Sequence, residues 1–135
     1  MTMLTRRAVA MAALIGLLWA ALASPVQADV KDYEFKLVQS EVKKGDGAIV
    51  SVRLLNKRSG KPVPDAVIAA KRIDMAPDGM EMMAAPLEQL PSTEPGVYRF
   101  KASLTMAGRW QLSLGAKVQG ETGTVESKLV LKALP

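Results

Sequence analysis

Apolar and polar residues alternate along several short segments of the chain, and turn residues separate these segments. The alternation first appears in DYEFKLVQ (residues 32–39) and then in GAIVSVRLLN (residues 47–56). It returns in VYRFKASL (residues 97–104) and GRWQLSLGAKV (residues 108–118). A period of two puts every second side chain on the same face of a β-strand. The pattern is therefore typical of antiparallel strands that bury one face.

Two further segments extend this pattern. DAVIAAKRI (residues 65–73) reads as a strand in the first half, and residues 124–132 alternate again near the end. Six or seven short strands in about 100 residues predict an all-β fold, an immunoglobulin-like antiparallel β-sandwich. The positions expected to face the core are Tyr33, Phe35, Leu37, Ala48, Val50, Val52, Leu54, Tyr98, Phe100, Ala102, Leu104, Trp110, Leu112, Leu114, Ala116, Val118, Val125, Leu129 and Leu131.

The N-terminal residues have the features of an export signal. Arg6 and Arg7 precede an apolar stretch of roughly 17 residues, and Val26-Gln27-Ala28 has the small-x-small pattern of a cleavage site. This predicts a signal-peptide helix over residues 1–28, cleaved after Ala28.

The mature part would then be one domain, residues 29–135, in the periplasm. An uncleaved N-terminus that anchors the domain to the membrane, facing the periplasm, is the alternative. Without Arg6 and Arg7 the formal net charge falls from +5 to +3. This mild excess, with no aromatic residues among the basic ones, argues against a nucleic-acid partner. We expect a monomer.

The chain has no cysteine and no histidine. This composition excludes Ser-His-Asp and Cys-His nucleophiles, the usual zinc sites and thiol redox chemistry. No phosphate-binding glycine loop is present, so the sequence predicts a protein that is not an enzyme. Asp74, Asp78 and Glu81 lack the spacing of a calcium loop, and we assign them to turn capping and surface charge.

The segment DMAPDGMEMMAAP (residues 74–86) carries four methionines within nine positions: Met75, Met80, Met82 and Met83. Met106 is a fifth candidate further along. We refer to these five residues as the methionine cluster. The prolines and the Asp-Gly pair interrupt the alternation, so at best Met80–Ala84 forms a short edge strand that joins the two sheets.

Two interpretations of the methionine cluster stay open. Methionine fills irregular gaps in a core and makes adaptable contacts with partners. Alternatively, thioethers are soft, neutral ligands that suit Cu(I). The turn at residues 77–79 could bring Met75, Met80 and Met82 together in a trigonal Cu(I) site, with Met83 or Met106 as alternates.

Two stretches carry a resemblance to a known family. The first is GKPVPDAVIAAKRIDMAPDGMEMMAAPL (residues 60–87), and the second is PGVYRFKASLTMAGRWQLSLGAKV (residues 95–118). They resemble the YtkA-like/FixH-like family, in which a strand leads to a methionine-containing loop and then to a hairpin. The hairpin is matched here by Gly96, Tyr98, Phe100, Leu104, Met106, Gly108, Trp110 and Leu112.

The resemblance implies an immunoglobulin-like sandwich outside the cytoplasm that takes part in copper or heavy-metal handling and tolerance. By position, Met75, Met80 and Met106 correspond to that family's methionines. The implied partners are metal-efflux or oxidase-assembly proteins. The chain would hold Cu(I) and pass it to such a partner, or it would be an interaction module that docks on the complex without binding metal.

Overall fold

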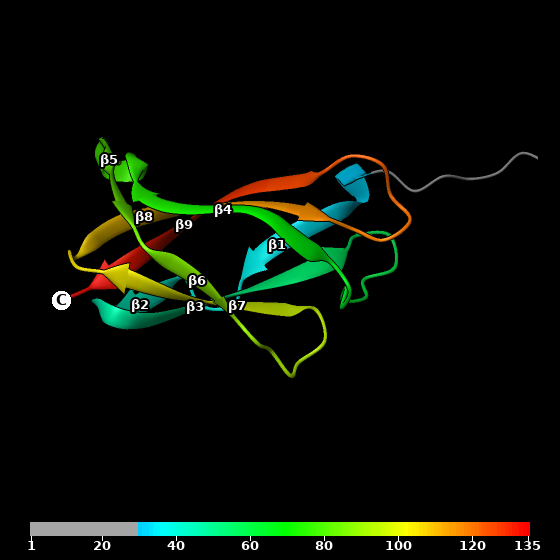
Figure 1. The fold of residues 1–135 in the computed structure, drawn as a ribbon, viewed down its shortest axis with the longest axis horizontal. Helices are drawn as coiled ribbons and strands as arrows, with labels where there is room; N and C mark the ends of the chain where they lie inside the picture. The colour runs from blue at the N-terminus through cyan, green and yellow to red at the C-terminus, as the bar shows by residue number, and fades with distance from the viewer. Residues whose placement is uncertain (1–29) are drawn as a thin grey trace, which may run out of the picture.

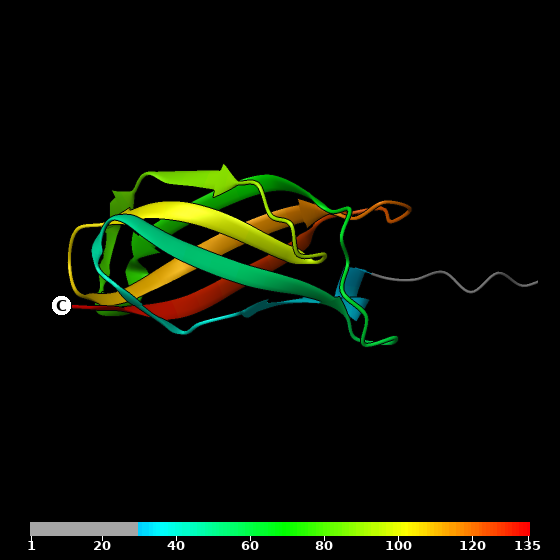
Figure 2. The same cartoon turned by 90° about the horizontal axis from the view of Figure 1, so that it is seen from below.

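The computed structural model describes residues 30–135, which form two β-sheets packed face to face (Figures 1 and 2). In chain order the elements are η1 (Val30–Asp32), β1 (Tyr33–Leu37), β2 (Glu41–Lys43), β3 (Gly45–Asn56), β4 (Val67–Met75), η2 (Ala76–Asp78), β5 (Met80–Ala85), β6 (Leu87–Leu90), β7 (Val97–Leu104), β8 (Gly108–Lys117) and β9 (Val125–Leu134).

The predicted signal peptide, residues 1–28, lies outside the described residues, as does Asp29. Between residues 30 and 135, the helical segments are too short and too polar for any of them to cross a bilayer.

The order of the strands confirms the predicted immunoglobulin-like sandwich. One sheet has the order β1-β3-β7-β6, and the other has the order β2-β9-β8-β4-β5. Immunoglobulin constant domains have the sheets ABED and CFG. Here β1, β3, β7 and β6 take the places of A, B, E and D, while β4, β8 and β9 take those of C, F and G. The other two strands extend the second sheet at its edges.

The described residues contain nine strands, two more than the upper limit of the prediction. The additional strands are β2 and β6. The three residues of β2 pair in parallel with β9, and the four residues of β6 pair with β7 between two prolines. Segments of this length show too few alternations to be recognised, because long-range pairing rather than local pattern defines them.

The core consists mainly of the side chains that the alternation predicts to face inward, joined by Ile73, Met75, Val97 and Ala133. Trp110 is 1% exposed, and Phe100, Leu54 and Leu112 are fully buried. Tyr33, Leu37 and Leu129 are only partly buried at the margin of this core. The remaining predicted core positions are all buried. Burial of apolar surface along both inner faces is what holds the two sheets together.

The chain passes from one sheet to the other through the predicted edge segment. β5 is the edge strand of one sheet and β6 is the edge strand of the other, with Pro86 between them. The predicted short strand that joins the sheets is therefore confirmed, and it extends one residue further, to Ala85. Pro86 suits the crossing because proline has no N–H to donate to a ladder.

Tyr98 ties β7 to the loop that precedes β4. Its hydroxyl donates a hydrogen bond to Val63 O (2.6 Å) and accepts one from Ala66 N–H (3.0 Å). Burial raises the pKa of Tyr98 above its ordinary value; the Ala66 hydrogen bond lowers it and the nearby Asp65 charge raises it further. The hydroxyl therefore serves the fold in its neutral form.

We expect Tyr98→Phe to lower the free energy of unfolding by about 1–2 kcal/mol, because both backbone partners lose their hydrogen bond. The folded pKa lies above the unfolded one, so this contribution is complete below about pH 10 and is lost as the pH rises toward the folded pKa. Urea unfolding at several alkaline pH values should show the wild type losing its advantage over the variant. An advantage that persists unchanged would contradict this role.

Candidate functional site

The five methionines of the cluster lie at one end of the sandwich. Met75 ends β4, Met80, Met82 and Met83 belong to β5, and Met106 lies in the turn between β7 and β8. In Figure 1 this is the end where η2, β5 and the β7–β8 turn lie close to the C-terminus. The fold therefore brings together residues that are up to 31 positions apart in the sequence.

Met75 and Met80 are cross-strand partners in the β4–β5 hairpin. The predicted turn therefore makes Met75 and Met80 neighbours along the backbone, next to a register shift between Asp74 and Met75. Their exposure differs, because Met75 is 1% exposed in the core whereas Met80 is 37% exposed at its edge.

Gly108, the first residue of β8, lies against the methyl end of the Met75 side chain. A Cβ at Gly108 would lie only 2.7 Å from Met75 Cε. Met106 is two residues earlier, is 40% exposed, and its carbonyl accepts a hydrogen bond from Trp110 Nε1 (3.1 Å). The turn that carries Met106 is therefore fixed to the core beside the glycine that Met75 contacts.

Met82 and Met83 occupy a different environment. Met82 is 91% exposed and Met83 is 40% exposed on the edge strand β5. A side chain that is 91% exposed makes few contacts, so the structure does not place Met82 in the packed surroundings of Met75. Of the expected group of Met75, Met80 and Met82, the fold pairs the backbones of the first two, while the Met82 side chain lies in solvent.

Asp74 fixes the beginning of the turn between β4 and β5. It is 5% exposed, and its Oδ1 accepts a hydrogen bond from Ala76 N–H (2.9 Å). Its Oδ2 accepts one from Arg72 Nε (2.9 Å), and Arg72 Nη2 donates to Glu81 O (3.0 Å). The expected turn-capping role of Asp74 agrees with this geometry, because the carboxylate satisfies a backbone donor two residues on.

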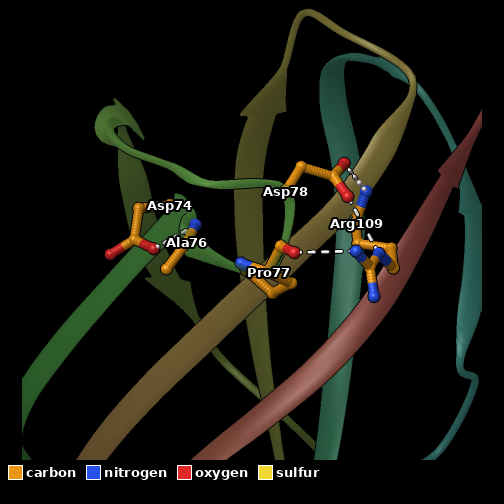
Figure 3. Close-up of polar contacts among 5 residues, drawn as sticks. All are labelled: Asp74, Ala76, Pro77, Asp78 and Arg109. Carbon is orange, nitrogen blue, oxygen red and sulfur yellow. Dashed lines mark hydrogen bonds and ion pairs between the residues drawn. The ribbon is translucent and has the colours of Figure 1, made fainter.

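Asp78 fixes the end of the same turn to β8 (Figure 3). Its Oδ2 accepts a hydrogen bond from the backbone N–H of Arg109 (2.8 Å), and its Oδ1 accepts one from Arg109 Nε (2.8 Å). Arg109 Nη2 also donates to Pro77 O (2.7 Å). The hydrogen bond from the Arg109 backbone N–H, and after it the one from the Arg109 side chain, hold the pKa of Asp78 below its ordinary value. The carboxylate is therefore charged at neutral pH.

Sequence reasoning did not identify Arg109 as part of this end of the molecule. Arg109 lies 31 residues after Asp78 and appears in the sequence as one of many solvent-exposed basic residues. The one sequence feature that could have pointed to Arg109 is its position next to Gly108, in the hairpin that resembles the family's hairpin.

The residue types present limit which cation this end can bind. Within residues 30–135, no three His, Cys, Asp or Glu side chains are grouped closely enough to hold a metal ion. The donors that the fold does gather are thioethers, which are soft and carry no charge. This donor set fits a soft monovalent cation such as Cu(I), and it does not fit Ca²⁺ or Mg²⁺, which take oxygen ligands.

The fold and this end define a class: a small all-β sandwich domain with a methionine-rich end beside its edge strand. The chain belongs to the YtkA-like family, whose model matches residues 27–115. That range contains the whole methionine cluster and most of β8. The FixH-like part of the resemblance stays a prediction.

No curated protein matches the chain. Among solved structures, the chain is similar to the "ZirS C-terminal Domain", with 14% sequence identity over 84% of this chain and 80% of that chain and a TM-score of 0.46.

Proposed function

We propose that this YtkA-like domain is an exported, non-catalytic protein that holds Cu(I) through thioethers and passes it to a metal-efflux or oxidase-assembly partner. The observation that carries the proposal is the pairing of Met75 with Met80 beside the turn that carries Met106. The copper ion is cargo in this proposal, and the protein contributes the sulfur donors and their positions.

The burial of the three methionines suits a site that holds a soft ion and releases it. Met75 would supply a donor from the dry interior, and Met80 and Met106 would supply donors from the partly exposed rim. Thioethers need no deprotonation, so binding should be nearly independent of pH, in contrast to thiolate or imidazole sites. They also cannot pair as disulfides outside the cytoplasm, where thiols are oxidised.

Met82 and Met83 would serve entry and transfer rather than tight binding. Both are exposed on an edge strand, next to Met80 in the sequence. A partner that carries its own soft ligands could approach this strand and take the ion stepwise. Transfer of this kind requires donors that two proteins can share, and an exposed thioether meets that requirement.

The test is an anaerobic titration of residues 29–135 with Cu(I) against a competing chelator. We expect Met80→Leu together with Met106→Leu to weaken the apparent affinity at least about tenfold, since even indirect changes around a metal cost that much. Met82→Leu is the matched control, because it removes one thioether of the same strand and should change the affinity much less. Leucine conserves volume, so the fold should tolerate each exchange.

The second candidate function is an interaction module that docks on an efflux or oxidase component without binding metal. The observation that favours it is the exposure of four methionines at one end, Met82 above all. Methionine-rich surfaces adapt to their partners. Absence of Cu(I) binding in the titration, together with partner capture that survives copper depletion, would favour this candidate.

A further inference from the structure

Met75 presents a difficulty for any ligand, because its side chain is 1% exposed. A buried thioether cannot bind an ion until something moves. The segment that covers Met75 therefore decides whether an ion can reach the sulfur. Any role of that segment in metal binding rests on the proposed function. The geometry of the segment does not depend on that function.

The η2 turn and the end of the Met75 side chain meet at Gly108 on β8. A Cβ at Gly108 would lie 2.7 Å from Met75 Cε and also 2.7 Å from Asp78 Oδ2. The methionine methyl group and the aspartate carboxylate thus approach the same glycine. The hydrogen bonds from Arg109 to Asp78 and to Pro77 O are what attach the turn to β8 at this point.

We propose that Asp78 and Arg109 form a latch over Met75, and that η2 lifts away from β8 when the latch opens, which gives a soft ion access to the Met75 sulfur. Asp78 and Arg109 are positioning residues in this proposal, because they act through η2 and bind no ion themselves.

The two ends of the turn are attached differently, and this favours motion at the Asp78 end. At its beginning, the buried Asp74 binds Ala76 N–H and Arg72 within the β4–β5 hairpin. At its end, the more exposed Asp78 binds Arg109 on β8. Gly79 comes next with φ +75°, a conformation that glycine adopts without strain. The turn can therefore pivot about Asp74 while the hairpin stays intact.

Reactivity of the sulfur toward hydrogen peroxide measures the opening directly and needs no copper. Peroxide transfers one oxygen to the thioether, which gives the sulfoxide, and leaves as water. Peptide mass spectrometry of the full chain follows each methionine separately, and the 91%-exposed Met82 serves as an internal reference. In the wild type we expect Met75 to react far more slowly than Met82.

We expect Asp78→Ala to increase the rate at Met75 about three- to fivefold relative to Met82, as suits the loss of an exposed ion pair. Arg109→Lys keeps the charge but loses the forked geometry, and it should act in the same direction. Glu94→Ala is the control, because it removes another carboxylate that faces an arginine, Arg53 at 3.8 Å, far from the methionine cluster.

Tyr98→Phe separates local opening from a general loss of stability, since it weakens the opposite end of the sandwich. Unchanged Met75 rates in Asp78→Ala and Arg109→Lys would overturn the latch, and so would an equal increase in Tyr98→Phe. If the latch variants respond as expected while the wild type fails to bind Cu(I), the latch stands and the copper function fails. If the latch and the copper function both hold, the latch variants should also take up Cu(I) about threefold faster, since the open form that admits the ion is more populated.

Discussion

Replacing Trp110 with alanine is expected to lower the free energy of unfolding by about 3–5 kcal/mol, the usual cost of truncating a buried tryptophan. Trp110 is 1% exposed and is the largest fully buried side chain in the described part of the chain. It also anchors the β7–β8 turn through its hydrogen bond to Met106 O. Urea unfolding followed by circular dichroism measures the change.

Val130→Ala is the control for this prediction. Val130 lies on the neighbouring strand β9 next to Leu131, the cross-strand partner of Trp110, but it is 49% exposed. Its truncation should cost no more than about 0.5 kcal/mol. If Trp110→Ala cost as little as Val130→Ala, Trp110 would not be the central side chain of the core.

Gly96→Ala is expected to have the second largest effect, a loss of about 2–4 kcal/mol. Gly96 has φ +78°, where a Cβ costs about 1–2 kcal/mol. The new Cβ would also collide with Pro62 Cβ and lie 3.1 Å from Pro62 Cα. A proline ring cannot move aside as a flexible side chain can, so the neighbouring backbone has to shift. Thermal or urea unfolding measures the loss.

Gly60→Ala provides the matched control. Gly60 has φ +70°, and a Cβ there would meet nothing within 4 Å. This variant should show only the conformational cost, so the difference between the two variants reports the collision with Pro62. Equal losses would mean that Gly96 and Pro62 are not in close contact.

The sequence was sufficient to predict the sandwich because its strands are long and half buried. In β8, Trp110, Leu112 and Leu114 alternate with Gln111 and Ser113, and the buried set is the one that the alternation indicates. The joining strand after the Asp-Gly turn was also predictable, since Pro86 stops β5 where the chain has to change sheets.

The arrangement at the methionine-rich end was predictable only in part. The turn indicated that Met75 and Met80 would meet, because the two residues flank it closely in the sequence. The burial of Met75 and the contact of Asp78 with Arg109 depend instead on the docking of β8 beside β4, which brings distant segments together. A local pattern contains no information about such a contact. The exposure of Met82 likewise depends on how the β4–β5 hairpin pairs, with a register shift between Asp74 and Met75.

Binding of a soft monovalent ion by the methionine sulfurs at this end of the sandwich is tested most directly by copper K-edge X-ray absorption on the Cu(I)-loaded domain. We predict sulfur as the neighbour of copper, and loss of that signal when Met75, Met80 and Met106 are all changed to leucine. A spectrum with only nitrogen or oxygen neighbours, or a sulfur signal that survives in the triple variant, would contradict the proposed site.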